Sequence, residues 1–580
     1  MEKWLEQFRH RLATVDAVPQ LALMGVLVGA VTALIIFLFR FVIETTQRGL
    51  LPDADVENYE GLAWQMRLLL PVGGALAISF IWSLVSARSR QVGVVHVLER
   101  LAYNQGYLPL KNLWLQFLSA TISIVSGHSV GREGPSVHIG AASGSLLGQW
   151  LKLPDNSLRT LIACGAAASI AAAFNTPIAG VIFAMEVIVM EYSIAGFTPI
   201  IVAAVSATVL TRSVLGSSAA LVVPPVAISG MWEYLLIVVL GLLLGALAAL
   251  FNKLTHACAV MSKSVNIWGK FIFAGTLTGV VAIFVPQIMG IGYDTLNAAM
   301  AGEITFWLLI VILLAKLFVT AISIGIGLPG GLIGPSLVIG AVAGAFLGAF
   351  ALMIFPGNVA STGFYAMLGM GAMMAAVLQA PLAALMALLE FTVNADIILP
   401  GMLAVIIASM TSRHIFASEG IFSLLLKARG LDYSNHPIAQ SLRRAAVSSV
   451  MSASFIRLPA VLQTQDIEEH LADQPSWVVI QEQPGDRPVV LRTADLALAL
   501  KSEDADEISL TEIQADRCEC ECISGHATLQ QAFDMMLAAD RELLCVVRHY
   551  RPVGADNAVA TGVVIGILSK EMIGTYYQYP

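Results

Sequence analysis

The chain has 580 residues, of which 57% are hydrophobic and only 12% are charged, and its mean hydropathy is +0.78. Soluble globular domains carry about 25% charged residues, so this composition excludes a wholly water-soluble fold. Most of the chain is therefore predicted to lie in a lipid bilayer. The formal net charge is −8, and nothing in the charge pattern indicates nucleic-acid binding.

Charged residues are distributed unevenly along the chain. They are sparse from about residue 17 to 425 and return at ordinary density from about residue 431. This change predicts a membrane domain at 18–430, a linker at 431–448 and a water-soluble tail at 449–580. Residues 1–17 do not resemble a cleavable signal, and their apolar side chains at near-helical spacing predict a short amphipathic helix on the membrane surface.

An internal repeat is the most informative feature of the membrane domain. Residues 131–136, Gly-Arg-Glu-Gly-Pro-Ser, align with residues 331–336, Gly-Leu-Ile-Gly-Pro-Ser, at a shift of 200 positions. A second match, at a shift of 204, pairs three residues with three others: Pro177, Ala179 and Glu186 with Pro381, Ala383 and Glu390. Two matches in the same order predict an all-α polytopic domain of two related halves, at about 18–220 and 230–425. We expect inverted repeats with broken helices, as in many transporters.

The repeated segment has the composition of a helix start. Proline suits the first helical turn because it has no amide hydrogen to leave unsatisfied, and glycine allows close backbone approach. Bare N–H groups at the positive end of a helix dipole bind anions. Glycine and proline can also serve tight helix packing alone, but the repetition and a charged residue in one copy favour an anion site. The predicted site residues are Gly131, Arg132, Gly134 and Pro135 in one copy and Gly331, Leu332, Ile333, Gly334 and Pro335 in the other.

The charged residue is Glu133, a carboxylate within an apolar stretch. Ionisable residues inside a membrane are costly and usually functional. At a helix N-terminus the carboxylate can itself occupy the anion site, and protonation would neutralise and release it. We therefore predict that Glu133 is a tethered anion that competes with a bound anion and responds to pH. The alternative is a carboxylate permanently paired with Arg132.

The segment 131–135 matches the GREGP signature of the CLC family, and 331–335 stands where that family carries GxFxP. Residues 171–180, Ala-Ala-Ala-Phe-Asn-Thr-Pro-Ile-Ala-Gly, also resemble the family's sequence after GREGP. The resemblance covers about 18–430. It implies a homodimeric chloride channel or chloride/proton antiporter with an anion pathway in each subunit, and it implies that Glu133 is the external gating glutamate.

Several positions depart from the family's pattern. The first anion motif, GSGIP in the family, retains only Gly93, and Val92 replaces the serine that donates a hydroxyl to the ion. In the second motif, Ile333 replaces phenylalanine. Phe422 replaces a tyrosine whose hydroxyl points at the ion in many relatives. Backbone amides remain, but each lost donor is expected to weaken binding by about 1–2 kcal/mol if nothing replaces it.

The internal proton-relay glutamate of many antiporters corresponds to Val187, which cannot carry a proton. Uncoupled flux is therefore favoured over strict exchange, although some coupled members also lack this acid. Glu186 and Glu390 are interpreted as structural carboxylates near helix ends. His128 and His138 lie close to the first motif, where each either biases Glu133 by titrating near neutral pH or packs as a hydrogen-bonded histidine.

The tail is expected to be a small α/β domain. Strands are predicted at 477–480, 489–491, 543–548 and 562–568, and helices at 529–537 and at the C-terminal end. This order resembles the tandem CBS pair of many CLC proteins. The nucleotide pattern of such units is incomplete, with Glu571 after Ser569 and with Arg492 before Asp495, so a structural or dimer-stabilising role is favoured over adenine-nucleotide binding. The thiols of Cys518, Cys520 and Cys522 are expected on one face of a strand, without a metal.

The sequence thus predicts transmembrane chloride transport of the voltage-gated CLC channel or uncoupled type, gated by protonation of Glu133. Two alternatives remain: a chloride/proton antiporter, and a membrane sensor or scaffold with a regulatory tail. No enzyme or cofactor is expected, since the chain has no nucleophile elbow, P-loop or metal-ligand set. The expected partners are chloride and other small anions, protons, lipid and a second copy of the chain. The expected location is a bacterial inner membrane, with the tail in the cytoplasm.

Overall fold

The computed structural model forms two compact units, which are described separately. The membrane unit comprises Leu21–Trp150 and Arg159–Ser434, and the tail unit comprises Met1–Gln20, Leu151–Leu158 and Asn435–Pro580. The residues that the structure describes are 12, 17–192, 194–216, 230–356, 359–392, 394–431, 441–463, 467, 471, 474–481, 488–500, 507–510, 517–547 and 563–578. The amphipathic helix predicted at 1–17 lies almost wholly outside these residues.

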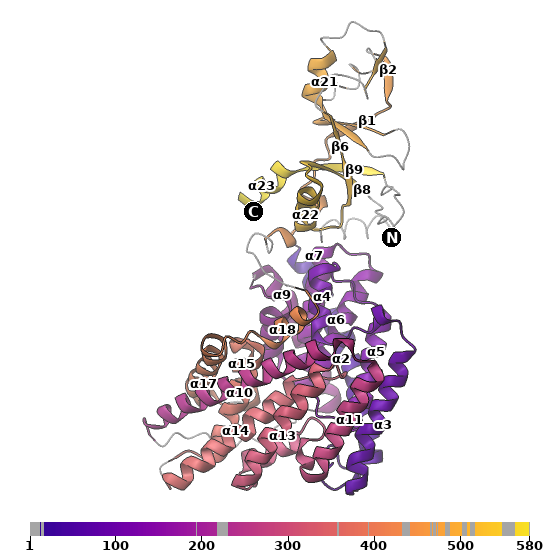
Figure 1. Cartoon of the computed structure of the whole chain (residues 1–580). Coiled ribbons are helices and arrows are strands. Elements are labelled where there is room, and N and C mark those ends of the chain that lie inside the picture. Colours follow the sequence, from indigo (N-terminus) through magenta and orange to yellow (C-terminus); the bar gives the residue numbers. More distant parts are fainter. Residues whose placement is uncertain are drawn as a thin grey trace. The chain divides into compact units, whose positions relative to one another are not determined.

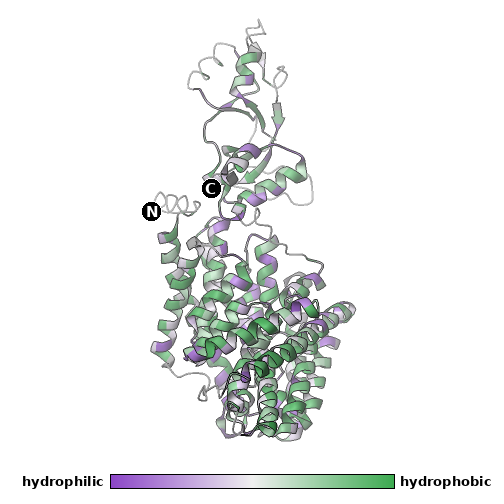
Figure 2. Cartoon of the chain, turned by 90° about the vertical axis from the view of Figure 1, so that its left-hand side faces the viewer, coloured by the Kyte–Doolittle hydropathy of each residue, from purple (hydrophilic) through white to green (hydrophobic). Residues whose placement is uncertain are grey.

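Within its described residues the membrane unit is built from helices, as expected where lipid offers the backbone no hydrogen-bond partner (Figure 1). Figure 2 shows that hydrophobic residues dominate these helices. Within the described residues, nine helical segments are long and apolar enough to cross a membrane. The helices are α2 (Val18–Leu50), α3 (Trp64–Ser83), α4 (Val94–Tyr103), α5 (Leu110–Val125), α6 (Glu133–Trp150), α7 (Asp155–Phe174), α8 (Pro177–Phe183), α9 (Ile194–Leu215), α10 (Glu233–Met261), α11 (Ile267–Phe284), α12 (Tyr293–Ala301), α13 (Phe306–Gly325), α14 (Ile333–Ile354), α15 (Thr362–Leu378), α16 (Pro381–Thr392), α17 (Ile398–Met410) and α18 (Ile421–Ala428).

Glycines let two helix pairs approach to backbone contact, once in each half. In the first half, a Cβ on Gly140 of α6 would overlap the carbonyl of Gly165 in α7. In the second half, a Cβ on Gly340 of α14 would overlap the carbonyl of Gly369 in α15. The two pairs are related by the shifts of 200 and 204 that define the sequence repeat. The sequence repeat therefore corresponds to a repeated packing contact. In a membrane there is no hydrophobic effect between helices, and small residues allow the close approach that holds them together.

Two glutamates join the halves by capping each other's helices. Glu186 accepts hydrogen bonds from the backbone N–H groups of Leu382 (3.3 Å) and Ala383 (2.7 Å), at the start of α16. Its repeat mate Glu390 accepts from Ile178 (3.0 Å) and Ala179 (2.8 Å), at the start of α8. Each carboxylate satisfies N–H groups that a helix start leaves unpaired. The interpretation of both residues as structural carboxylates is confirmed, and this reciprocity is what a twofold relation between the halves produces.

We expect Gly140→Ala to destabilise the membrane unit. The added methyl group has no space against Gly165, and overpacking of this kind costs about 1–3 kcal/mol. Gly73→Ala is the matched control, because Gly73 lies in α3 with nothing within 4 Å of an added Cβ. Thermal unfolding of both variants in detergent should show a lower melting temperature for Gly140→Ala alone. Equal melting temperatures would contradict the packing argument.

The tail unit is an α/β domain with three small sheets (Figure 1). Among the described residues, one sheet has the order β1-β3-β4-β6, a second pairs β2 with β5, and a third has the order β7-β8-β9. The strands are β1 (Phe455–Leu458), β2 (Val461–Gln463), β3 (Trp477–Ile480), β4 (Val489–Arg492), β5 (Glu507–Ser509), β6 (Arg517–Glu519), β7 (Glu521–Ser524), β8 (Leu543–Val547) and β9 (Val564–Ser569). The helices are α21 (Thr493–Leu500), α22 (Leu529–Ala539) and α23 (Lys570–Gln578).

The predicted strands and helices of the tail are confirmed to within a few residues, but the cysteine prediction is wrong. Cys518 lies in β6 and Cys522 in β7, which belong to different sheets, and Cys520 lies between them. The chain leaves one sheet for the next at Cys520, whose N–H donates to the carbonyl of Pro488. The three residues therefore do not lie in one strand, although their side chains belong to one hydrophobic cluster.

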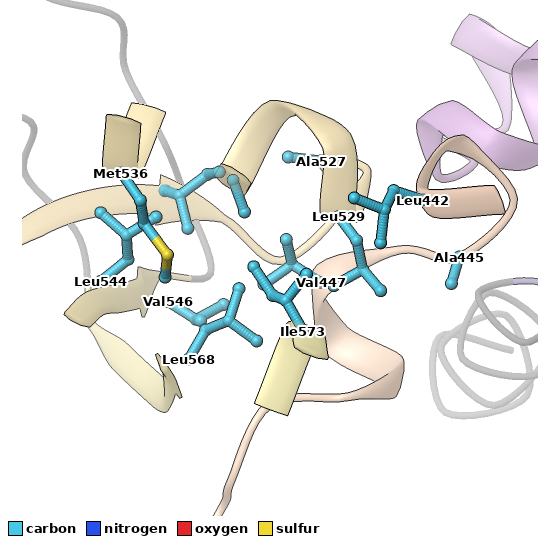
Figure 3. Close-up of a cluster of buried hydrophobic side chains, with 12 residues drawn as sticks. Leu442, Ala445, Val447, Ala527, Leu529, Met536, Leu544, Val546, Leu568 and Ile573 are labelled. Atoms are coloured by element: carbon cyan, nitrogen blue, oxygen red, sulfur yellow. The ribbon is translucent and has the colours of Figure 1, made fainter. Parts of the chain in front are cut away.

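Hydrophobic side chains from distant segments form the core of the β7-β8-β9 region (Figure 3). Met536 from α22, Leu544 and Val546 from β8, and Leu568 from β9 pack together there. Leu442, Ala445 and Val447, which the sequence placed in a linker, belong to the same buried cluster. Residues 442–447 are thus part of the folded tail unit, because burial of these side chains ties them to its core.

We expect Leu544→Ala to destabilise the tail unit by about 2–5 kcal/mol, the usual range for a buried leucine replaced by alanine. Leu537→Ala is the matched control, because Leu537 of α22 is 57% exposed whereas Leu544 is fully buried. Limited proteolysis of the full chain should cut the tail of Leu544→Ala faster than that of Leu537→Ala. Equal cleavage rates would show that the cluster contributes little.

Candidate anion site

The two copies of the repeated motif meet inside the membrane unit. The N–H of Gly131 donates to the carbonyl of Gly331 (2.6 Å), and the N–H of Gly331 donates to the carbonyl of Gly131 (2.7 Å). This pair is an isolated antiparallel bridge between the halves. The helices α6 and α14 begin two residues beyond it, at Glu133 and Ile333. The predicted convergence of two helix starts on one point is therefore present.

The Glu133 carboxylate lies at this junction and is 1% exposed. Its Oε2 accepts a hydrogen bond from the N–H of Gly334 (3.0 Å), at the start of α14. Its Oε1 accepts a hydrogen bond from the hydroxyl of Tyr293 (2.5 Å). A Cβ on Gly131 or Gly334 would meet the carboxylate, so both positions need glycine to leave room for it. A negative group thus occupies the positive N-terminus of α14, the place predicted for an anion.

Arg132 does not form the predicted alternative pair with Glu133. Its guanidinium makes an ion pair with Glu44 of α2 (3.8 Å) and lies over the ring of Tyr293, 5.5 Å from the ring centroid. In the part of the chain that the structure describes, no ion pair joins Arg132 to Glu133. The hydrogen bonds of Glu133 come instead from Tyr293 and Gly334, so the carboxylate is not locked by its neighbour in sequence.

A cavity of about 600 Å³ reaches the motif glycines. Seven predicted site residues line it: Val92, Gly93, Gly134, Gly331, Leu332, Ile333 and Phe422. The six other predicted residues do not line it: Gly131, Arg132, Glu133, Pro135, Gly334 and Pro335. Of these, Gly131, Gly334 and Pro335 lie at the Glu133 carboxylate. Gly331 lines the cavity and also bonds to Gly131, so the cavity reaches the junction where the carboxylate lies.

The charged residues that line this cavity are mostly basic. They are Arg90, Lys263, Lys270 and Arg429, with Glu99 as the one acidic side chain among the lining residues. Glu99 is paired with Arg429 at 3.0 Å, which leaves three further cations. Excess positive charge in a cleft with low-dielectric walls attracts anions and raises their local concentration.

Two residues at the site were missed from the sequence. Tyr293 begins α12 and contacts Glu133, from which it is 160 positions distant in the chain. Gln116 of α5 is fully buried and lines the cavity, and its Oε1 accepts a hydrogen bond from the N–H of Gly93 (2.6 Å). Its Nε2 has no hydrogen-bond partner among the described residues. Gln116 could have been noticed as a polar residue within the apolar run 113–126, whereas no sequence signal pointed to Tyr293.

The remaining sequence candidates pack within the protein. Val187 is 4% exposed and follows Glu186 in a turn of π-helix. His138 Nε2 lies 2.9 Å from His96 Nδ1, and His128 Nδ1 lies 3.3 Å from the Ser126 hydroxyl. These contacts agree with hydrogen-bonded packing histidines.

The residues of the incomplete nucleotide pattern in the tail unit are also engaged. The Ser569 hydroxyl accepts a hydrogen bond from the N–H of Met572 (3.2 Å), at the start of α23. The guanidinium of Arg492 lies over the ring of Trp477, 5.5 Å from the ring centroid. Both side chains thus have structural partners within their own unit.

Comparison with known proteins identifies relatives of the membrane unit. The chain is 31% identical over 432 residues to a putative chloride channel protein, ClcB-like, of Ralstonia nicotianae, which covers 73% of this chain and 100% of that protein. It is 31% identical over 324 residues to the H(+)/Cl(−) exchange transporter ClcA of Vibrio vulnificus, which covers 54% of this chain and 68% of that protein.

Solved structures share the fold. A slow cyanobacterial Cl−/H+ antiporter aligns with a TM-score of 0.62 and 24% identity, covering 70% of this chain and 97% of that one. A eukaryotic CLC transporter aligns with a TM-score of 0.61 and 19% identity, covering 96% of this chain and 98% of that one. Residues 74–413 match the family model described as voltage gated chloride channel. With that match, the helices long enough to cross a membrane and the converging motifs, the chain belongs to the CLC family and is an integral, multi-pass membrane protein.

Proposed function

We propose that this protein transports chloride across a membrane and that Glu133 is the gate of its anion pathway. The observation that carries the proposal is the hydrogen bond that the Glu133 carboxylate accepts from the N–H of Gly334, at the N-terminus of α14. A carboxylate in that place excludes a free anion from it. Relatives named as a chloride channel and as a chloride/proton exchanger support chloride as the ion.

The mechanism follows from charge at the helix start. While ionised, Glu133 takes the hydrogen bonds and the dipole field that would otherwise bind chloride. Protonation removes the charge, so the side chain no longer competes and the pathway opens. The basic residues of the cavity, Lys263 and Lys270 among them, supply chloride to this point from the cavity side.

The side chains that can donate a hydrogen bond to chloride differ from those of the family's pattern. Val92 and Phe422 line the cavity without hydroxyl groups, and Gln116 lines it beside Gly93. Since the Gln116 oxygen accepts from Gly93, its amide nitrogen is the free end, and an amide N–H is a suitable donor to chloride. Gln116 therefore supplies the donor that the serine of the family's first motif provides elsewhere.

Channel-like or uncoupled flux is the favoured mode, because Val187 offers no proton acceptor on the inner route. Antiport is the second candidate, supported by the printed titles of the exchanger relative and of the cyanobacterial antiporter neighbour. The sensor alternative is disfavoured, since both helix starts and Glu133 are in place. A transport role rather than an enzymatic one agrees with the family.

The cellular setting completes the proposal. The chain acts as a homodimer in a bacterial inner membrane, with a CBS-type tail in the cytoplasm. Apolar side chains exposed on α9 and α17, such as Val209 and Met402, support burial against lipid or a second copy. The tail stabilises the dimer rather than binding adenine nucleotide, which agrees with the structural contacts of Ser569 and Arg492.

The gate is tested by Glu133→Ala in liposomes loaded with chloride, with chloride efflux and proton uptake recorded together. Efflux through the wild type should increase as the pH falls, and efflux through Glu133→Ala should be independent of pH. Glu419→Ala is the control, because Glu419 is a half-exposed carboxylate paired with Lys427, and its pH profile should match the wild type. Uphill proton movement lost in Glu133→Ala would establish the antiporter instead. No efflux of chloride, nitrate or fluoride would favour the sensor.

The amide donor is tested by Gln116→Leu. Loss of one hydrogen bond worth about 1–2 kcal/mol should weaken chloride binding by about 5–30-fold, measured by calorimetry in detergent. Gln149→Leu is the matched control, because Gln149 lies in a helix, bonds to the carbonyl of Leu108 and does not line the cavity. Unchanged chloride affinity in Gln116→Leu would remove Gln116 from the site.

A further inference from the structure

Tyr293 bonds to the carboxylate oxygen of Glu133 that the helix start does not bind. Its hydroxyl donates to Glu133 Oε1 at 2.5 Å, while the Gly334 N–H donates to Oε2 at 3.0 Å. Among the described residues, it is the one side chain that hydrogen-bonds to this carboxylate. The hydrogen bond is charge-assisted while Glu133 is ionised, and such bonds are short and roughly twice as strong as neutral ones.

The position of the Tyr293 hydroxyl is fixed by contacts around the whole residue. Its N–H donates to Oε2 of Glu57 (3.0 Å), and its ring contacts the guanidinium of Arg132 and the ring of Phe174. The preceding Gly292 has φ of +89°, and a Cβ there would lie 3.0 Å from Lys316 Nζ. Glycine is therefore needed for α12 to begin at Tyr293, and the hydroxyl is preorganised to reach the gate.

We propose that Tyr293 is a positioning residue of the gate: its hydroxyl holds the ionised Glu133 carboxylate in the anion site and thereby sets the pH at which the pathway opens. This inference rests on the proposed role of Glu133. A donor that bonds to the charged form of a carboxylate favours that form over the protonated one. With Tyr293 present, release of Glu133 therefore requires a lower pH than it would with the helix start alone.

Charged groups surround Tyr293 in two steps. Arg132 and Glu57, from the loop after α2, interact with Tyr293 itself. Further charges act on these two: Glu44 of α2 on Arg132, and Asp294 of α12 and Lys316 of α13 on Glu57. Burial raises the pKa of Glu57 to about 7. Glu57 contacts Tyr293 through the backbone N–H and not through the hydroxyl, which allows the two effects to be separated.

The test is the pH dependence of chloride efflux from liposomes for the full-length Tyr293→Phe variant. Phenylalanine keeps the ring contacts with Arg132 and Phe174 and loses only the hydroxyl. Protonation of Glu133 then becomes easier, so the midpoint of the pH–flux curve should move up by about one pH unit. Tyr365→Phe is the matched control, because the fully buried Tyr365 also donates to a glutamate, Glu233 (3.0 Å), away from the gate. Its midpoint should equal that of the wild type.

The outcomes separate this inference from the proposed function. Chloride efflux that is independent of pH in both Glu133→Ala and the double variant Tyr293→Phe/Glu133→Ala would show that Tyr293 acts through the gate. If the midpoint of the pH–flux curve does not move in Tyr293→Phe while efflux through Glu133→Ala is independent of pH, the role of Tyr293 is wrong and the gate stands. Persistent pH dependence in Glu133→Ala would instead overturn the gate itself. A Glu57→Gln variant should keep its pH dependence; if it is lost, Glu57 is the titrating group and the inference is wrong.

Discussion

The exchange of two backbone hydrogen bonds between Gly131 and Gly331 is the constraint on which the rest of the site depends. It is possible only because neither residue has a side chain, so that the two helix starts come into direct contact. Once they do, the carboxylate of one half lies within hydrogen-bond reach of the other half's amide at Gly334. The cavity that ends at Gly134 and Gly331 is lined from both halves for the same reason.

The same twofold logic appears away from the motifs. Glu186 and Glu390 cap each other's partner helices, and the glycine pairs of α6 with α7 and of α14 with α15 repeat one packing contact. At the junction the relation is broken. Glu133 has Ile333 as its counterpart, so one half provides the tethered charge and the other provides the N–H that receives it. The proposed gate thus lies at a position where the repeat departs from symmetry.

Spacing in the sequence predicted the two halves, the converging helix starts and the place of Glu133, because these depend on short motifs with a defined backbone chemistry. It did not predict Tyr293, whose contact with Glu133 spans 160 positions and depends on how α12 packs. The tail followed the same division. Strands such as β3 and β8 followed from local composition, whereas the burial of residues 442–447 and the change of sheet at Cys520 depend on tertiary contacts.

The hydrogen bond between the Glu133 carboxylate and the N–H of Gly334 also bears on how the protein folds. Many ion sites remain incomplete, or even unfolded, until the ion arrives. Here the chain supplies its own negative group, since the Glu133 carboxylate accepts the N–H of Gly334 at the N-terminus of α14. The contact between the two halves at the start of α14 is therefore completed by a side chain of the protein itself.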